Sequence, residues 1–401
     1  MHKGSYIFRQ LCSVLPKDHF DYLLDKYEVS KDARSFSYWN HLLVMLWAQL
    51  SRRESLRDIV DSLKGHRSKF YNLGFGNGIS RSTLSDANSQ RNVHVFEEYA
   101  KRMVGIASER RVDVNRLFVE EHGGRLLALD ASVLSFPHDK FPWSAACGPY
   151  EGLKLHSLFD ILSSIPVCNL LTDVSVGDQS VMHQMPYERG NYYVFDRAYV
   201  KREVLQYIND IGAWYVVRRK RRMSYRILET NVAETENGIR KDHIVLLDGQ
   251  WARRRYRTRL RYILFYDEEK DREMEFFSNI LHEDACFVTS LYRQRWQIEL
   301  FFKWIKQHLR IRRFYGTSEN AVKIQIYCCI IAYCMVAVAE REYALDMSIF
   351  DVLRILSTTL FEKRDIRQLF EQIRTQEKGS VEENNLHFVT LQTMLNFPTG
   401  H

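Results

Sequence analysis

The chain is poor in the residues that break a fold or crosslink it. Its 401 residues contain only seven Pro and eighteen Gly while 45% are apolar, which excludes a collagen-like or largely disordered chain. The seven Cys are an odd number, and no C-x-x-C pair precedes a second pair or a His couple. We therefore expect neither a disulfide framework nor a zinc site, and a soluble protein of the reducing cytoplasm.

Membrane and nucleotide-binding signals are also missing. The apolar stretch Ile326 to Ala339 has fourteen residues, fewer than the roughly twenty that span a bilayer, so a buried helix is predicted there. The first sixteen residues contain no sustained apolar segment and no small-residue cleavage site, so no export signal is predicted. The chain also contains no G-K-[ST] and no H-E-x-x-H motif. We expect no membrane partner.

The excess positive charge is small in total and concentrated in two segments. The chain has 57 Lys plus Arg against 50 Asp plus Glu, a net charge of +7. Residues 218–261 hold fourteen cations and five acids, a local +9, and residues 291–313 hold seven cations and one acid, a local +6. Removing these from the total leaves −8 for the other residues. Such an acidic body with basic segments indicates a polyanion such as DNA, although solvated arginines would give the same composition.

Helical periodicity from Tyr6 to about Arg110 predicts an all-helical amino-terminal region. Within it the glycine-rich segment 72–78 precedes a helix, 80–91, that Ser80 or Ser82 would cap. The polar residues of this helix are Arg81, Asn88, Gln90 and Arg91. The pattern fits a DNA-reading helix-turn-helix, and it fits a plain helical hairpin with a solvated face at least as well.

Short apolar runs rich in β formers follow Arg125 and predict strands. These runs are 126–130, 154–161, 167–174, 192–196 and 214–218, with a helix at 201–211. Further strand-like pieces at 225–229, 243–247, 260–266 and 273–277 indicate a β-rich insertion, and helices return from Thr289 to about Arg374. The order predicts an α/β fold with a mixed central sheet.

Two acids follow predicted strands. Asp130 ends the run Leu126 to Leu129, and Asp196 ends Tyr193 to Phe195, so each is placed at the rim of the sheet, where α/β folds bind ligands. Each acid alone is more often a turn or helix-cap residue. A catalytic interpretation therefore needs a third acid.

The third acid is Glu299, in a segment from Leu291 to Arg313 that is predicted to form one helix. At 100° per residue, Tyr292, Arg295, Glu299 and Lys306 project within about 60° of one another, while apolar residues cover the other directions. An i, i+4 salt bridge between Arg295 and Glu299 would explain two of the four residues. The alternative is that Asp130, Asp196 and Glu299 are oxygen ligands of two Mg²⁺ or Mn²⁺ ions, with the other three residues on phosphate oxygens.

These residues resemble the DDE transposases of bacterial insertion sequences, in particular the family-four group with its Y-(2)-R-(3)-E-(6)-K signature. Tyr292, Arg295, Glu299 and Lys306 match that signature at every defined position. Asp130 in Leu-Asp-Ala-Ser and Asp196 in Phe-Asp-Arg-Ala-Tyr are similar to the first and second acidic motifs of the family. The second motif is often Asp-Arg-Gly there, so Ala198 is a departure. The resemblance covers about residues 125–340.

The resemblance implies a ribonuclease-H-like core whose three acids bind two Mg²⁺ or Mn²⁺ ions, nick the ends of a mobile element and join them to target DNA. Its implied partners are double-stranded DNA, as terminal inverted repeats and as target, and a second copy in a homodimer. The cellular place would be the bacterial cytoplasm, associated with the nucleoid. Relatives that flip a base hold it on an aromatic ring. Candidates for such a platform are Trp251, Phe276 and Phe277, for each of which core packing is the commoner role.

The expected domains are a helical DNA-end-recognition domain at 1–115, the ribonuclease-H-like core at 116–218 and 285–345, the β-rich insertion at 219–284, and a helical segment at 346–401 with a dimerisation role. Two other functions stay open: a catalytically silent DNA-binding relative of transposases, and a structure-specific nuclease with the same core. Intact acids argue against the first, and recovery of joined target DNA would exclude the second.

Overall fold

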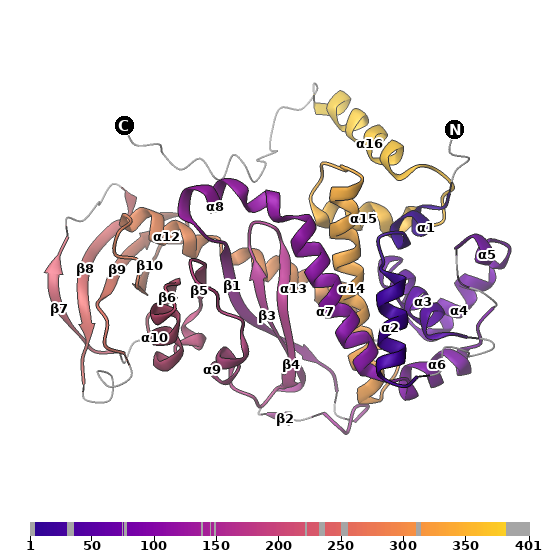
Figure 1. Cartoon of the computed structure of the whole chain (residues 1–401), viewed down its shortest axis with the longest axis horizontal. Coiled ribbons are helices and arrows are strands. Elements are labelled where there is room, and N and C mark those ends of the chain that lie inside the picture. Colours follow the sequence, from indigo (N-terminus) through magenta and orange to yellow (C-terminus); the bar gives the residue numbers. More distant parts are fainter. Residues whose placement is uncertain are drawn as a thin grey trace.

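The computed structural model of the chain is an α/β fold with helices at both ends of the sequence. It describes residues 5–29, 36–73, 75, 78–137, 139–144, 146–147, 150–220, 223–231, 237–249, 256–309 and 314–381. The sheet fills one half of the molecule and helices α1–α6 fill the other, with α7 and α14 between them (Figure 1). The mixed sheet and the helical ends confirm the fold class predicted from the sequence.

The amino-terminal region is helical, as predicted. Its helices are α1 Ile7–Cys12, α2 Lys17–Lys26, α3 Tyr38–Leu50, α4 Leu56–Lys64, α5 Phe70–Leu73, α6 Arg81–Gln90, α7 Val93–Arg110 and α8 Arg116–His122. Ser37, Ser55 and Ser80 cap α3, α4 and α6, each hydroxyl accepting a hydrogen bond from the backbone N–H three residues later. Ser80, one of the two predicted caps, therefore starts the helix of the predicted helix-turn-helix. Residues 74, 76 and 77 of its glycine turn lie outside the described residues.

The sheet has ten strands. They are β1 Leu126–Ser135, β2 Ala146–Cys147, β3 Tyr150–Asp160, β4 Ile165–Asp173, β5 Tyr192–Phe195, β6 Trp214–Arg218, β7 Tyr225–Thr230, β8 Ile239–Leu247, β9 Leu260–Asp267 and β10 Arg272–Ser278. Strands β4, β3 and β1 form an antiparallel meander, and β5 and then β6 continue the sheet parallel to β1. This order of five strands is that of a ribonuclease-H-like core.

The β-rich segment does not fold as a separate sheet. Strand β10 pairs antiparallel with β6, and β9, β8 and β7 follow in order, so these strands lengthen the central sheet at one edge. Figure 1 shows them as the far end of the sheet, away from the amino-terminal helices.

The remaining helices lie on the two faces of the sheet and at the carboxyl end. They are α9 Asp178–Val181, α10 Arg202–Asp210, α12 Ala285–Arg293, α13 Trp296–Leu309, α14 Glu319–Glu342, α15 Ile349–Thr359 and α16 Ile366–Val381. One hydrophobic core joins the amino-terminal helices, α13, α14 and one face of the sheet, and a second core under α10 covers the other face.

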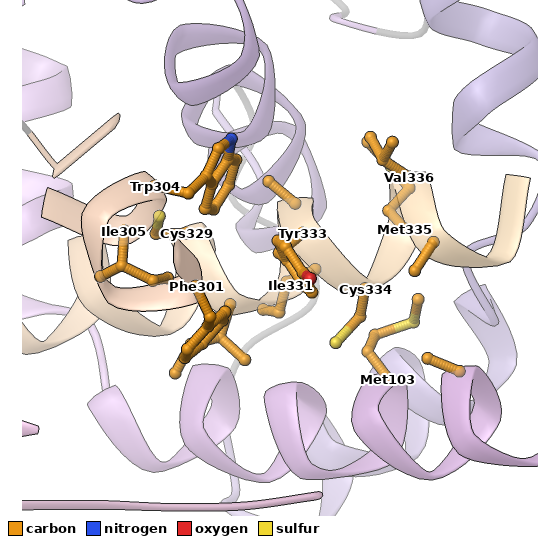
Figure 2. Packing of buried hydrophobic residues seen from close by; sticks show 14 of the residues in the cluster. Met103, Phe301, Trp304, Ile305, Cys329, Ile331, Tyr333, Cys334, Met335 and Val336 are labelled. Atoms are coloured by element: carbon orange, nitrogen blue, oxygen red, sulfur yellow. The ribbon is translucent and has the colours of Figure 1, made fainter. Parts of the chain in front are cut away.

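Helix α14 is the centre of the larger core. It is long and apolar enough to cross a membrane, but 89% of its most apolar window is buried inside the protein, as expected for a core helix. Figure 2 shows its side chains against α13 and α7, with Tyr333 between Phe301 and Trp304. Its cysteines Cys328, Cys329 and Cys334 are buried free thiols. The buried helix predicted at 326–339 is therefore confirmed.

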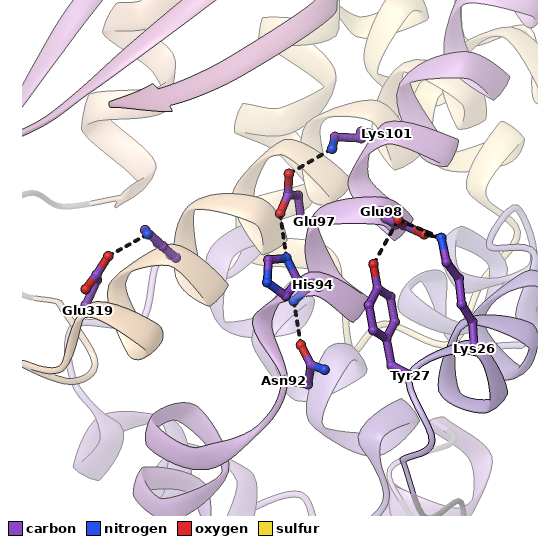
Figure 3. Close-up of polar contacts among 9 residues, drawn as sticks. Lys26, Tyr27, Asn92, His94, Glu97, Glu98, Lys101 and Glu319 are labelled. Atoms are coloured by element: carbon purple, nitrogen blue, oxygen red, sulfur yellow. Dashed lines mark hydrogen bonds and ion pairs between the residues drawn. The ribbon is translucent and has the colours of Figure 1, made fainter. Parts of the chain in front are cut away.

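Polar contacts on the outer side of α7 add little to this packing. Glu98 accepts hydrogen bonds from Lys26 at 2.7 Å and Tyr27 at 2.8 Å, and Glu97 pairs with Lys101 at 2.8 Å (Figure 3). Exposed pairs of this kind contribute about 0–1 kcal/mol each. The position of α7 therefore depends mainly on its buried residues, which include Phe96, Tyr99 and Met103.

Candidate active site

Asp130 lies inside a strand, and the prediction that it ends one is wrong. Strand β1 continues to Ser135 because Ala131 to Ser135 stay paired with β3. Side chains alternate along a strand, and Leu126 and Ala128 belong to the core that contains α13, whereas Leu127 and Leu129 belong to the other. Asp130 therefore faces α13, and its side chain is 23% exposed.

Asp196 directly follows β5, as predicted. Strands β1 and β5 run parallel, and the last residues they pair are Leu129 and Phe195. The next residue on each strand is one of the two acids. Asp196 lies two residues after Val194 and four after Tyr192, so it continues the face of β5 that packs on the core with α13. The register of β1 and β5 therefore places both acids side by side on one face.

The segment predicted as one helix from Leu291 to Arg313 is two helices, so that prediction is wrong. Helix α12 ends at Arg293 and α13 begins at Trp296. The N–H of Arg295 donates to the carbonyl of Tyr292 at 3.1 Å, a tight turn in place of a helical step. The turn lets α12 contact β5 and β6 while α13 contacts β1. The four signature residues therefore do not share one helical stripe. Residues 310–313 lie outside the described residues.

Arg295, in this turn, bridges two of the acids. Its Nη1 donates to Asp130 Oδ2 at 2.9 Å, and its Nη2 donates to Glu299 Oε1 at 2.5 Å. The Arg295 side chain is 17% exposed and that of Glu299 is 58% exposed. The simple i, i+4 salt bridge is therefore present. An i, i+4 pair does not account for the second contact of Arg295, with Asp130, which is 165 residues away in sequence.

Tyr292 joins the group and Lys306 does not. The hydroxyl of Tyr292 lies 3.4 Å from Asp196 Oδ1, a long hydrogen bond. Lys306 is exposed on α13, seven residues after Glu299, or about 10 Å along the helix axis. Among the described residues it forms no ion pair with the three acids. The structure thus brings together Asp130, Asp196, Tyr292, Arg295 and Glu299.

The three acids act on one another electrostatically. The pKa of Asp130 is raised to about 6, chiefly by burial and in smaller part by the charges of Asp196 and Glu299, while Arg295 and the Ala131 N–H oppose the rise. Burial alone would lower the pKa of Arg295, but its contacts with Asp130, Tyr292 and Glu299 raise it overall. The site therefore needs a cation among its carboxylates, and Arg295 meets that need in this structure.

The donor set fits a hard divalent ion. Asp130, Asp196 and Glu299 offer carboxylate oxygens, which Mg²⁺ and Mn²⁺ prefer. Within the described ranges, however, no three acid, His or Cys side chains stand close enough to hold one metal ion together. The carboxylate oxygens are thus of the type that Mg²⁺ and Mn²⁺ prefer. In this structure the guanidinium of Arg295 lies between Asp130 and Glu299.

Arg295 also has an unused donor. Its Nε is buried and forms no hydrogen bond with any described group. A buried charged donor without an acceptor is costly, so an acceptor from outside the chain, such as a phosphate oxygen, would suit this position.

Two of the three aromatic candidates for a stacking platform, Phe276 and Phe277, do not lie at the surface. Phe276 and Phe277 are each 1% exposed, and Phe276 packs on the ring of Tyr292 with centroids 4.6 Å apart. Trp251 lies outside the described residues. Sequence analysis missed Trp296, which is 42% exposed and directly follows Arg295. The available signal was the presence of an aromatic residue between Tyr292 and Glu299. The prediction of one helix gave no reason to expect that residue at the surface.

Several arginines of the basic insertion form ion pairs with acidic side chains. Arg261 donates to Asp242 from Nε at 2.8 Å and from Nη2 at 2.7 Å, and both side chains are buried. Arg219 pairs with Glu275, and Arg259 pairs with Glu229 at 3.2 Å. Residues 251–255 lie outside the described residues. The charge count therefore overstates the cations that this segment can offer to DNA.

Comparison with known proteins identifies the family of the chain. Residues 121–335 match the model of the family described as "Transposase DDE domain", and residues 3–76 match a "Domain of unknown function (DUF4372)". The Sinorhizobium fredii protein y4zB, named as a transposase, is 29% identical over 290 residues, which are 71% of this chain and 78% of that protein.

Two further proteins are similar. A Geobacillus stearothermophilus protein, named as the transposase for insertion sequence element IS5377, is 27% identical over 215 residues, 52% of this chain and 55% of that protein. A piggyBac transposase synaptic complex with hairpin DNA is 10% identical with a TM-score of 0.45, covering 96% of this chain and 84% of that one. The structural likeness is too weak to add to the fold assignment.

Proposed function

The chain belongs to the transposase DDE domain family, and we propose that it binds the terminal inverted repeats of an insertion sequence, cleaves there and joins the freed ends to target DNA. It is a transposase of an insertion sequence, as the matched relatives are named. One observation carries the proposal. Arg295 bridges Asp130 and Glu299, and Asp196 lies close enough to raise the pKa of Asp130, although the three acids come from elements far apart in sequence.

The three acids are proposed as the catalytic residues. A DDE domain uses a divalent metal in general, and we propose two Mg²⁺ or Mn²⁺ ions held by these carboxylates. When bound, they would supply Lewis-acid stabilisation of charge on the scissile phosphate. Asp130 must be deprotonated to be a ligand, so a metal ion would have to displace the proton that the raised pKa of Asp130 favours.

Arg295 is proposed to exchange carboxylates for DNA phosphate. In this structure its Nη atoms hold Asp130 and Glu299, and its Nε has no acceptor. A phosphate oxygen satisfies the Nε and competes for the Nη donors, which leaves the two carboxylates open to metal. Tyr292, held against Phe276 and beside Asp196, would donate to the same phosphate. Lys306, exposed on α13, would contact phosphate farther along the DNA.

The wider assembly follows from the same proposal. Two copies would hold two element ends, residues 1–115 would read the terminal repeats, and the 346–401 segment would serve dimerisation. A second surface for self-association is offered outside that segment by Val112, just before α8, and Leu117, within α8, whose apolar side chains are 64% and 74% exposed. The protein would work in the cytoplasm, in association with the nucleoid, where its DNA partners are.

The proposal is tested on labelled duplex DNA that spans the junction between the element and its flank. With Mg²⁺, the purified protein should nick at the 3′ end of the element and join that end to added target DNA. Glu299→Gln should lower cleavage on the order of 10³-fold or more, because a metal ligand is lost, while the affinity for the duplex stays the same.

Glu319→Gln is the matched control. Glu319 is 52% exposed and pairs with Lys323 in an i, i+4 contact like that of Glu299 with Arg295. Its variant should cleave like the wild type. Nicking that survives Glu299→Gln would remove Glu299 from the mechanism. Binding without cleavage by the wild type would indicate a silent relative, and nicks without joined products would indicate a nuclease.

A further inference from the structure

A pocket of about 550 Å³ opens among the amino-terminal helices, remote in sequence from the three acids. It lies where the outer side of α4 and the start of α5 meet the beginning of α6. Its floor is apolar and consists of Val60, Leu63 and Phe70, which are 4%, 1% and 5% exposed. Its rim carries the charged residues Arg57, Asp61, Lys64, Arg67 and Arg81.

The rim has four cations and one acid. The acid, Asp61, pairs with Lys64 at 3.0 Å. Arg57, Arg67 and Arg81 are exposed, and none of them forms an ion pair with a described residue. Three exposed guanidinium groups at one pocket give it a positive electrostatic potential that attracts an anion.

Helix α6 adds its amino end to the same rim. The helix has ten residues, and the hydroxyl of Ser80 accepts from the Thr83 N–H at 3.1 Å. The N–H groups of the first turn that Ser80 does not cap, and the positive end of the helix dipole, favour an anion here. Arg81, the first residue of the helix, lines the pocket.

Two polar residues at the carboxyl end of α6, Asn88 and Arg91, are not free to read DNA. Asn88 is 1% exposed, and its Oδ1 accepts a hydrogen bond from the Nε2–H of His41 at 2.7 Å. Arg91 donates to the carbonyls of Phe36 and Ser37. Two of the four residues suggested for base reading therefore serve packing. Arg81, at the amino end of the predicted helix-turn-helix, is exposed and lies at the pocket.

We propose that this pocket binds the sugar-phosphate backbone of the DNA duplex at the element end, with Arg57, Arg67 and Arg81 on phosphate oxygens. The proposal rests on the proposed transposase function and deepens it. Three arginines from separate segments suit successive phosphates of a strand better than one small anion, and the apolar floor suits the sugars between them. Such contacts position the duplex without reading its sequence.

The test uses the full chain and fluorescence anisotropy with a labelled duplex taken from DNA directly flanking the gene, and a scrambled duplex of equal length. Replacing Arg57, Arg67 and Arg81 by Gln should weaken binding to both duplexes by about 100-fold, because charge-assisted contacts are lost. The salt slope of log affinity should fall by about 3. Replacing the same three residues by Lys should restore most of the affinity, which a folding defect would not allow.

Arg116→Gln with Arg354→Gln is the matched control. These arginines are 74% and 69% exposed and are paired with Glu120 and Asp351. This double variant should bind like the wild type. Inorganic phosphate titrated by calorimetry separates a small-anion site from a DNA site: phosphate binding that the Gln variant loses, with DNA affinity unchanged, overturns the proposal.

The outcomes separate this proposal from the proposed function. If the Gln variant binds both duplexes like the wild type and still cleaves the element end, the pocket is not a DNA site and the transposase function stands. If the wild type binds neither duplex, end binding itself fails and the pocket proposal fails with it. Loss of affinity in the Gln variant and recovery in the Lys variant support the proposal.

Discussion

Two groups of arginines in this molecule differ in what neutralises them. Around the sheet, Arg295 lies between Asp130 and Glu299, and Arg261 forms a two-pronged pair with Asp242. At the amino-terminal pocket, Arg57, Arg67 and Arg81 have no acid partner among the described residues. The sequence places most excess charge in the first region, but several arginines there are paired with acids, whereas the three at the pocket have no acid partner among the described residues.

The difference teaches that a count of cations does not locate a DNA surface. An arginine paired with a buried acid fixes backbone or site geometry, and removing it leaves an uncompensated charge. An exposed arginine without a partner contributes little to folding and is available to phosphate. The two groups should therefore respond in opposite ways to substitution.

Arg261→Ala should give the largest effect on stability. Asp242, 3% exposed, would be left as a buried carboxylate without its partner, at a cost of about 3–5 kcal/mol in the free energy of unfolding. Urea unfolding followed by circular dichroism measures the loss. A loss below about 1 kcal/mol would show that this pair is not structural and that the insertion can release its arginines to DNA.

Arg57→Ala is the control for that comparison. Because Arg57 is exposed and unpaired among the described residues, its loss should change the free energy of unfolding by no more than about 0.5 kcal/mol. A large destabilisation by this substitution would break the distinction between the two groups.

Acid should destabilise the fold through protonation of His41, which joins α3 to α6 by its hydrogen bond with Asn88. Burial lowers the pKa of His41 from 6.5 to about 3, so the unfolded chain binds more protons than the folded one between these values. Stability should therefore fall as the pH drops through 6.5, with His41 accounting for about 2 kcal/mol between pH 7 and pH 5. His156 in the sheet, with a pKa lowered to about 4 by burial, acts in the same direction.

Denaturation by urea at pH 7 and pH 5 measures this dependence. His41→Gln keeps a donor toward Asn88 and removes the titrating group, so its stability should change less between the two pH values than that of the wild type. An equal change in the free energy of unfolding of both proteins would show that the protonation of His41 does not differ between the folded and the unfolded chain. His41 would then not report on the α3–α6 contact.

Much of the fold follows from local patterns. Alternating and continuous apolar runs predicted the strands, and the Ser80 cap and the apolar stretch at 326–339 predicted their helices. These features depend on neighbours in sequence. The three acids and Arg295 could likewise be proposed as site residues, because metal binding calls for carboxylates and phosphate binding calls for a cation beside them.

What the sequence did not predict depends on partners far away in the chain. The parallel register of β1 and β5, which aligns Asp130 with Asp196, is set by the packing of both strands. The break between α12 and α13 arises because the two helices contact different strands. The burial of Asn88 and the pairing of Arg261 with Asp242 also come from tertiary contacts. Periodicity along one segment carries no signal for these.

The central claim is the proposal that Asp130, Asp196 and Glu299 bind metal as one site, two of whose carboxylates, Asp130 and Glu299, pair with Arg295 in this structure. Calorimetric titration with Mn²⁺ in the absence of DNA tests it on the wild type, Arg295→Ala and Glu299→Gln. Removing Arg295 should tighten Mn²⁺ binding by at least about tenfold, since a competing charge leaves the carboxylates, and removing the Glu299 charge should weaken it. Equal Mn²⁺ affinity in all three proteins would contradict the account.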